Sequence, residues 1–525
     1  VRLVTRTIQD LYFVMTVREL LVSPAALGRA LALGVLGTML AALPPAWEAA
    51  RTHPRAAMLR SVLESGLRAR LPAVSGAGVA LMAAGGLVLA LSSSVDGSFA
   101  GLFGVIIGAA LLTPAVTLLL MRFLRPAAGA LFGVLGRMAA TGVTAGLSRT
   151  GPAIAALTIA VSVSIGIGVM VDSFRGSLVV WLQRTLAADL YVAPVGSGGA
   201  GAALDPRAVA VLEADPAVAE VRPNRRVQVS WGDETVELLA AGVDSRLRSQ
   251  FDILAGDLDR VWADFVGGDA ILASEPFVHR YDVGVGDTLV LRTAAGPRGF
   301  LVGAVFRDYG SDRGMLMMSH RGYLAHWNDP ALSAVALNLR SSSDAGGDGG
   351  ADAAAAAEVA ERLRVATAGI QALEVRPNAR LRAATLQVFD RTFAITRVLR
   401  ALALVVAFVG VLSALMALQL ERSRELGVLR ANGMTPGQVW GMVASQTGLI
   451  GAAAGLMALP LGVLLAVLMI EFVNRRSFGW TMDLAVAPGI LVQGLAVAVG
   501  AALLAGLYPS WRMARTSPAE ALRSE

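Results

Sequence analysis

Seven stretches of the chain are long and apolar enough to cross a lipid bilayer, whose hydrocarbon core takes about 20 helical residues. They lie at 26–46, 71–91, 101–121, 152–171, 397–418, 441–470 and 488–508. Arg29 and Arg400 fall inside these stretches, each close enough to an end for its side chain to reach the membrane surface. The sequence therefore predicts a polytopic α-helical membrane protein with about seven spans.

Composition agrees with this interpretation and excludes several kinds of chemistry. Hydrophobic residues make up 55% of the chain, charged residues 16%, and the mean hydropathy is +0.62. All 45 basic residues are arginine, and there is no cysteine. Without lysine the chain has no standard P-loop, and without cysteine it has no disulfide, thiolate metal site or thiol nucleophile. We therefore expect no enzyme activity in this chain and any energy source in a partner.

Loop charge predicts the orientation. The arginine-rich loops are 51–70, 122–149, 422–430 and 512–523, and all four fall on one side of the seven-span arrangement. By the positive-inside rule that side is cytoplasmic, which places 172–396 outside and the C-terminus inside. This topology also accounts for the pI near 10.3 without a nucleic-acid partner. No acidic residue, lysine or histidine lies mid-span, so a proton relay or ion pathway has no side chains to use, which argues against a secondary transporter.

Residues 20–58 and 484–522 align without a gap and are identical at 17 of 39 positions. Each copy is an apolar helix followed by a Pro-x-Trp corner and an Ala-Arg-Thr-x-Pro tail, so we expect the ends of two related modules. Because the first copy has little chain in front of it, we expect the N-terminal part of a first module to be missing.

Small residues recur at helical spacing in two spans, Gly101, Gly104 and Gly108 in one and Gly448, Gly451 and Gly455 in the other. Such spacing allows close approach of helices. The partner helix could belong to this chain or to a second copy.

Residues 172–396 predict an α+β domain. The pentapeptide Glu220–Asn224 recurs at Glu374–Asn378, each time after a predicted helix, and 225–340 alternates as strands do. We expect an α+β base that carries a β-rich lobe. Asp172–Leu186 and 381–400 predict amphipathic stalk helices that continue the adjacent spans.

The loop at 419–440 predicts a helix, a sharp break and a second helix. A charged helix from Glu421 ends at Gly433, and Thr435-Pro-Gly-Gln438 reads as a capping box with proline in the first helical position. An ordinary basic turn beside the membrane would look similar.

The run Glu421–Met434 resembles the coupling region of FtsX-like ABC transporter permeases, and Tyr508–Leu522 resembles their closing tail. The resemblance extends to the MacB, LolC and LolE group, in which a module has one span, a large extracytoplasmic domain and three further spans. It implies these domains: 1–60, the last span and tail of a truncated first module; 61–150, a central pair of spans and a cytoplasmic linker; 151–171, the first span of the second module; 172–396, a MacB-like periplasmic core with stalk helices; and 397–525, a three-span permease domain with coupling loop 419–440.

The resemblance also implies a mechanism. A cytoplasmic ABC ATPase dimer, which holds ATP and Mg itself, would bind the coupling loop and move the extracytoplasmic domain. The expected contact residues are Glu421, Arg424, Glu425, Leu426, Gly427, Arg430, Gly433 and Met434, with a tail motif of Pro509, Trp511, Arg515 and Pro518. Further partners would be membrane lipid and a periplasmic or outer-membrane protein, and the location would be the bacterial inner membrane.

Two functions remain open at this point. One is export or extraction of a lipid, lipoprotein or peptide-like substrate, and the other is a signalling role that switches an extracytoplasmic partner such as a cell-wall hydrolase. His279, His320 and His326 do not fit a zinc spacing, so we expect no metal or catalytic site. Asp308, Asp312 and Arg313 predict a polar turn after a strand.

Overall fold

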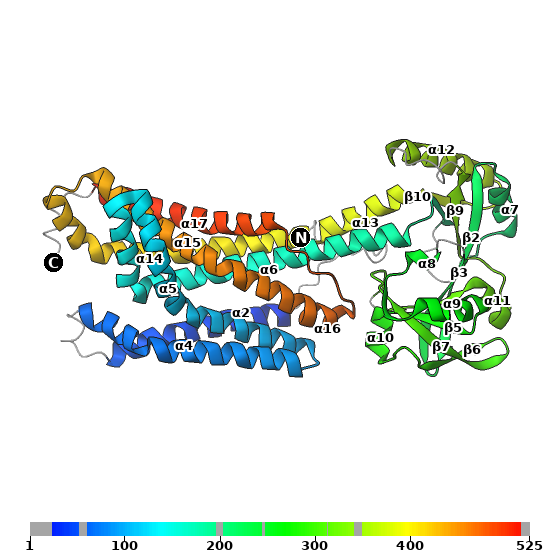
Figure 1. Ribbon diagram of the computed structural model, residues 1–525, viewed down its shortest axis with the longest axis horizontal. Helices are drawn as coiled ribbons and strands as arrows, with labels where there is room; N and C mark the ends of the chain where they lie inside the picture. The colour runs from blue at the N-terminus through cyan, green and yellow to red at the C-terminus, as the bar shows by residue number, and fades with distance from the viewer. Residues whose placement is uncertain are drawn as a thin grey trace. The chain divides into compact units, whose positions relative to one another are not determined.

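The computed structural model describes residues 24–51, 60–195, 203–243, 247–311, 313–340 and 349–515. The chain divides into two compact units. The helical unit comprises residues up to Met170, Arg391–Met469 and the chain from Val486, and the mixed unit comprises Val171–Asp390 and Ile470–Ala485. Figure 1 labels the helices and strands of both.

The helical unit is built from α2 (Pro24–Arg51), α4 (Arg60–Leu91), α5 (Val95–Ala145), the first part of α6 (Leu147–Thr185), α14 (Ala394–Ala431), α15 (Pro436–Leu468) and α17 (Pro488–Arg515). Six segments among the described residues are long and apolar enough to cross a membrane: Ala69–Leu91, Val95–Ala145, Leu147–Thr185, Asn378–Ala414, Pro436–Phe478 and Pro488–Leu507. The first predicted span, 26–46, lies inside α2 as a further helix. The polytopic helical class is confirmed.

The Pro-x-Trp corners are absent from the described helices, so this prediction is wrong. Helix α2 continues through Pro45 and Trp47 to Arg51, and α17 continues through Pro509 and Trp511 to Arg515. Proline removes one backbone donor and bends a helix, but membrane helices tolerate it because the freed groups find other partners.

The basic segment 122–149 is helical over most of its length and is not an open loop. Helix α5 runs to Ala145 and changes direction at Gly133, whose φ of 62° and ψ of −138° are not helical. Glycine adopts this backbone conformation readily because it has no Cβ.

Both glycine motifs serve contacts within the chain. A Cβ atom on Gly101 of α5 would lie 2.7 Å from the carbonyl oxygen of Gly85 in α4. One on Gly451 of α15 would lie 2.8 Å from Ala502 Cβ in α17. The helices that these glycines approach therefore belong to the same chain and not to a second copy.

The base of the mixed unit is formed by four strands at one end of a longer mixed sheet, and these strands have a ferredoxin-like β-α-β-β-α-β connectivity. Its elements are β1 (Leu190–Pro194), α7 (Pro206–Ala214), β2 (Val218–Trp231), β9 (Ala334–Leu339), α12 (Gly349–Thr367) and β10 (Leu373–Pro377). The strand order is β10-β1-β9-β2, with antiparallel neighbours throughout. Leu212 of α7 and Leu363 of α12 are fully buried against the strands.

The repeated pentapeptide occupies equivalent strands in the two halves of this sheet. Its first copy lies in β2 after α7, and its second lies in β10 after α12 except for Asn378, which begins the next helix. Val221 and Val375, the matching valines, both pack against the core beneath the helices. The repeat therefore marks the second strand of each β-α-β unit.

A β-rich lobe is inserted between β2 and β9. Its elements are β3 (Glu234–Ala241), α8 (Leu247–Gln250), β4 (Ile253–Gly256), α9 (Leu258–Gly267), β5 (Ala270–Ser274), α10 (Glu275–Tyr281), β6 (Thr288–Thr293), β7 (Gly296–Phe306), β8 (Leu316–Ser319) and α11 (His320–Trp327). Phe277 and Phe300 are buried in its core. The predicted α+β base with a β-rich lobe is confirmed.

The predicted stalk helices are present, with one interruption. Helix α6 runs unbroken to Thr185, and its Leu178 and Leu182 are 6% and 4% exposed. The second stalk is divided between α13 (Asn378–Thr392) and α14, because Phe393 leaves the helix.

Candidate functional site

The predicted break between helices forms a tight turn after α14, which we call the coupling turn (residues 432–435). Gly433 has φ 97°, and its N–H donates to Arg430 O at 3.1 Å. Met434 N–H donates to Leu429 O, also at 3.1 Å. These bonds satisfy carbonyls that a helix end leaves free. Nothing lies within 4 Å of a Cβ built on Gly433, so the backbone angle alone favours glycine here.

A complete capping box starts α15, as predicted. Gln438 N–H donates to Thr435 Oγ1 at 3.3 Å, and Thr435 N–H donates to Gln438 Oε1 at 2.9 Å. Pro436 occupies the first turn, where a missing N–H costs nothing. Paired caps on both sides of Gly433 fix the direction in which α15 leaves the turn.

The predicted contact residues line the approach to this turn. Glu421, Arg424, Glu425, Leu426, Gly427 and Arg430 all lie in the last three turns of α14, whereas Gly433 and Met434 lie in the coupling turn itself. Helical spacing places positions 421, 425 and 428 along one face of α14. Arg430 and Met434 are half-buried, and Gly433 is exposed.

Two exposed apolar side chains beside the turn were missed at the sequence level. Val428 and Trp440 are each 45% exposed, whereas Val439 and Val443 on the same helix as Trp440 are buried. Tryptophan is enriched at the centres of protein interfaces, so Trp440 adds an apolar surface to the charged one. The sequence could have predicted that Trp440 is exposed, because Trp440 lies outside the i, i+4 pattern of the buried Val439 and Val443.

The tail motif is described in part. Pro509, Trp511 and Arg515 belong to the last turns of α17, and Pro518 lies outside the described residues.

A second feature follows α15 at its other end. The π-helix η2 (Met469–Asn474) and α16 (Arg475–Phe478) lead into a stretch without helix or strand, residues 479–487, that ends where α17 begins. Residues 470–485, which we call the anchoring segment, belong to the mixed unit. Two backbone amides of the segment are held by serines of α6: Asp483 N–H donates to Ser177 Oγ at 3.2 Å, and Ala485 N–H donates to Ser173 Oγ at 3.0 Å.

The inserted lobe holds the same segment from the other side. Thr481 N–H donates to Glu275 Oε2 at 3.0 Å, and Tyr309 OH donates to Thr481 O at 2.8 Å. Arg307 forms an ion pair with Asp483 at 2.8 Å. The segment is therefore bonded to a stalk helix and to the lobe at once.

An aromatic cluster surrounds Trp480. Its ring lies 6.0 Å from Phe174, 5.8 Å from Tyr309 and 5.3 Å from Phe478, measured between centroids. Phe174 also contacts Phe389 of α13 at 5.2 Å. Aromatic pairs add about 0.5–1.5 kcal/mol each beyond their buried area. The cluster therefore ties both stalk helices and the lobe to the anchoring segment.

The polar turn predicted around Asp308 is wrong for Asp308 and Tyr309, which are 3% and 9% exposed. Tyr309 is covered by the anchoring segment, a contact between residues far apart in the sequence. Asp308 Oδ1 accepts from Gly310 N–H at 3.0 Å, while Oδ2 is buried without a hydrogen bond. Burial raises the pKa of Asp308 from 3.8 to about 6. Asp312 lies outside the described residues.

Comparison with known proteins agrees with this architecture. Residues 397–518 match the family model "FtsX-like permease C-terminal", and residues 150–362 match "MacB-like periplasmic core domain". The first match contains the coupling turn, and the second contains β1, β2 and β9 of the base together with the whole inserted lobe. Two segments of the chain are therefore similar to FtsX-like permeases and to MacB-like periplasmic core domains.

Individual proteins are similar to this chain over different shares of its length. An uncharacterized ABC transporter permease protein of Mycobacterium tuberculosis, Rv0987, is 40% identical over 531 residues, covering 100% of this chain and 61% of the relative. The lipoprotein-releasing system transmembrane protein LolC of Haemophilus influenzae is 30% identical over 127 residues, covering 24% of this chain and 32% of LolC. The periplasmic region of MacB from Actinobacillus actinomycetemcomitans superposes with a TM-score of 0.26 and 13% identity, covering 38% of this chain and 92% of that one.

The histidines His279, His320 and His326 of the lobe do not converge. His326 Nε2 lies 3.2 Å from Gly268 O, while His320 Nε2 is buried without a partner, and burial lowers the His320 pKa. His279 packs beside Gly479. Among the described residues no group of three histidines or carboxylates could hold a metal.

Proposed function

We propose that this FtsX-like permease transmits the ATP-driven motion of a partner ATPase to its mixed unit. The observation that carries the proposal is α15, which begins at the coupling turn and continues through η2 and α16 to Phe478. The residues that follow Phe478 make the aromatic and hydrogen-bonded contacts by which the anchoring segment is held. A displacement at Thr435 would thus reach the lobe through one helical segment and not only through the stalks.

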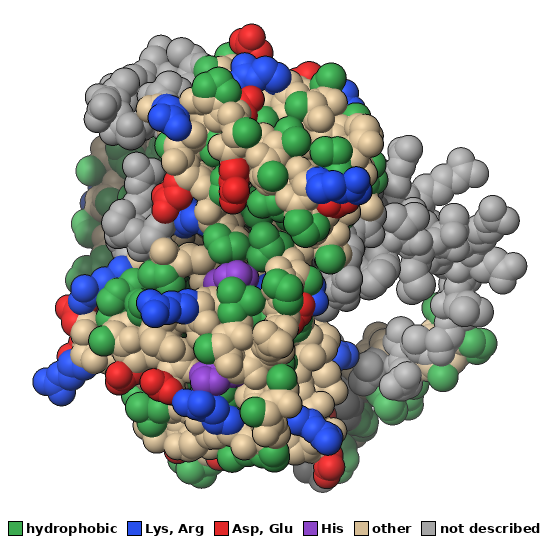
Figure 2. All heavy atoms as spheres, turned by 90° about the vertical axis from the view of Figure 1, so that its right-hand side faces the viewer, with side chains coloured by type: hydrophobic (Ala, Val, Ile, Leu, Met, Phe, Trp, Pro, Cys, Tyr) green, Lys and Arg blue, Asp and Glu red, His purple; other side chains and the backbone are tan. Residues whose placement is uncertain are grey.

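The partner in this proposal is a dimeric ABC ATPase that holds ATP and Mg itself. It binds the last turns of α14, the coupling turn and the exposed Trp440 on the cytoplasmic side of a bacterial inner membrane. The mixed unit is then extracytoplasmic and the C-terminus cytoplasmic. A nucleic-acid partner receives no support, because acidic and basic side chains are interspersed over the visible face of the mixed unit (Figure 2).

We favour export or extraction of a lipid, lipoprotein or peptide-like substrate as the output of this motion. The match to LolC, a protein named for lipoprotein release, supports this choice over 24% of the chain. The anchoring segment would serve equally in a permease that switches an extracytoplasmic partner.

The test is ATPase stimulation in nanodiscs by this permease and its partner. We expect Glu425→Lys and Gly427→Arg to abolish stimulation while the protein inserts and elutes normally. Glu234→Lys, which makes the same charge change on an exposed residue of the lobe, is the matched control and should leave stimulation unchanged. Full stimulation by both coupling variants would refute the assignment.

A further inference from the structure

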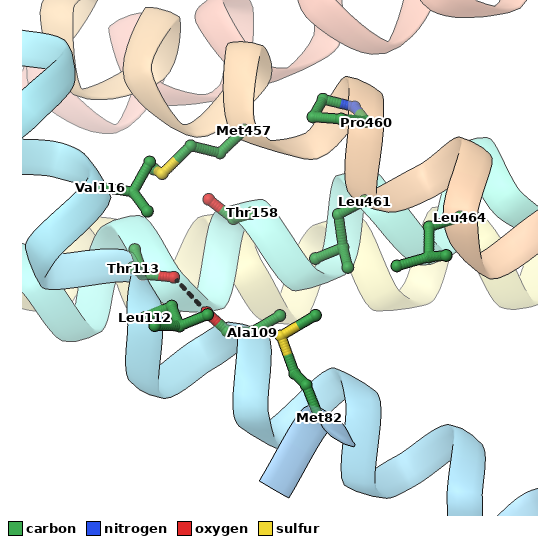
Figure 3. A pocket seen from close by; sticks show the side chains of 10 residues that line it. All are labelled: Met82, Ala109, Leu112, Thr113, Val116, Thr158, Met457, Pro460, Leu461 and Leu464. Carbon is green, nitrogen blue, oxygen red and sulfur yellow. Dashed lines mark hydrogen bonds between the residues drawn. The ribbon is translucent and has the colours of Figure 1, made fainter. Parts of the chain in front are cut away.

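An apolar pocket of about 280 Å³ lies inside the helical unit between α4, α5, α6 and α15 (Figure 3). Met82 and Met457 approach it from opposite sides in that view. Its lining residues are Met82, Ala109, Leu112, Thr113, Val116, Thr158, Met457, Pro460, Leu461 and Leu464. The volume is nearly twice the roughly 150 Å³ of an engineered apolar cavity that binds benzene, so the pocket has room for a substantial apolar group.

The wall is almost entirely apolar. Eight of the ten lining residues are apolar, and the other two are threonines whose hydroxyl hydrogens are already donated to backbone carbonyls. Thr113 Oγ1 donates to Ala109 O at 3.1 Å, and Thr158 Oγ1 donates to Ala454 O at 3.4 Å. The wall therefore has no free donor, and a polar ligand would lose most of its hydration without replacement bonds, so the lining favours a hydrocarbon.

The helices cannot close the space by moving together. A Cβ on Gly108 of α5 would lie 2.6 Å from Gly78 O, so the backbones of α4 and α5 already touch. Likewise a Cβ on Gly462 of α15 would lie 2.7 Å from Ile165 Cβ of α6. An empty space of this size forfeits the dispersion contacts of its lining atoms, so an occupant is favoured.

The pocket is open to the outside of the helical unit, and its helices are long and apolar enough to cross a membrane. Val116 and Leu464, each 38% exposed, lie on its rim. Thr158 and Met457 lie well inside membrane-spanning segments. The middle of the hydrocarbon core is about 15 Å from either headgroup region, a depth that the ends of phospholipid chains farthest from the headgroup occupy.

We propose that the pocket binds one acyl chain of a bilayer phospholipid. The bound chain fills the space between the helix pair α4–α5 and the spans α6 and α15. It enters from the surrounding hydrocarbon, with which the rim is continuous, and it leaves the headgroup at the membrane surface.

The test is photo-cross-linking of the full-length protein in nanodiscs with a phospholipid that carries a diazirine near the end of one chain. Mass spectrometry should map adducts to Met82, Leu112 and Met457 more strongly than to Val406, which is 66% exposed on α14. A diazirine next to the headgroup should not label the pocket.

Two variants make the result specific. Ala109→Phe fills the pocket, and Val116→Trp narrows its rim at an exposed position that tolerates a large side chain. Each should lower labelling of Met457 at least fivefold, whereas Ala83→Phe, at an exposed position of α4 outside the lining, should not. Labelling of the pocket no stronger than that of Val406, or unchanged by both variants, would overturn the proposal and mark the lipid there as ordinary annular lipid or the space as filled by protein.

Discussion

Replacing Trp480 with alanine should release the anchoring segment from the mixed unit while leaving the unit folded. The ring contacts Phe174, Tyr309 and Phe478, and the neighbouring residue Thr481 depends on the same docking for its bonds to Glu275 and Tyr309. The lobe's own core does not include Trp480.

The expected loss follows from the contacts. A fully buried aromatic residue replaced by alanine costs about 3–5 kcal/mol. Because Trp480 is half-buried, we expect about 2–3 kcal/mol for docking of the segment. At about 1.4 kcal/mol for each factor of ten, the population of the undocked state should rise about 30- to 140-fold.

Hydrogen exchange measures this population directly, since local opening exposes protected amides. The amides of Thr481, Asp483 and Ala485, which donate to side chains outside the segment, should exchange about 30- to 140-fold faster in Trp480→Ala. Phe478→Ala, which removes a ring that is 48% exposed, should change them less than tenfold. Unchanged exchange at 481–485 in the Trp480 variant would refute the view that this cluster holds the segment.

Three further outcomes are expected. The pKa of Asp308 is raised to about 6, so its contribution to the free energy of unfolding is largest below pH 3.8 and declines as the pH rises through 6, by about 3 kcal/mol in all. Asp308→Asn should remove that decline when the free energy of unfolding is measured across pH 4–7. The same pH dependence in both proteins would contradict the burial argument. Gly433→Val should weaken ATPase binding about 5- to 30-fold, because a left-handed backbone costs a residue with a Cβ about 1–2 kcal/mol. Gly433→Asn should retain most of the affinity, because asparagine tolerates this conformation better. Equal affinities of the two variants and the unchanged protein in a binding titration would show that the turn need not form. Gly101→Leu should lower the unfolding temperature in detergent, because the new Cβ would meet the Gly85 carbonyl. Gly86→Leu is the control, because nothing lies within 4 Å of a Cβ built there, and it should not lower that temperature. Equal unfolding temperatures for the two variants would argue against the contact between Gly101 and Gly85.

The sequence predicted features that depend on neighbouring residues and missed those that depend on distant ones. A run of 20 apolar residues has one stable form in a bilayer, so the later spans lie in helices as expected. The capping box at Thr435 and the repeated strand at Glu220 are likewise local patterns. The prediction for Asp308 was wrong because the anchoring segment, which covers the neighbouring Tyr309, is more than 160 residues away in the sequence. The predicted corner at Pro509 was wrong because the local cost of a proline did not outweigh continuation of the helix.

The inserted lobe departs from and returns to a single point of the base. Asn224 of β2 faces Ala334 of β9 across the sheet, and Ser333 N–H donates to Asn224 O at 2.9 Å. Residues 225–333 thus form a cassette whose two ends are already side by side, as the ends of a hairpin are. Exchange of the cassette for a short turn, or for a lobe of another shape, would leave the ladder of the base intact, which offers evolution and protein engineering the same route to a new binding specificity.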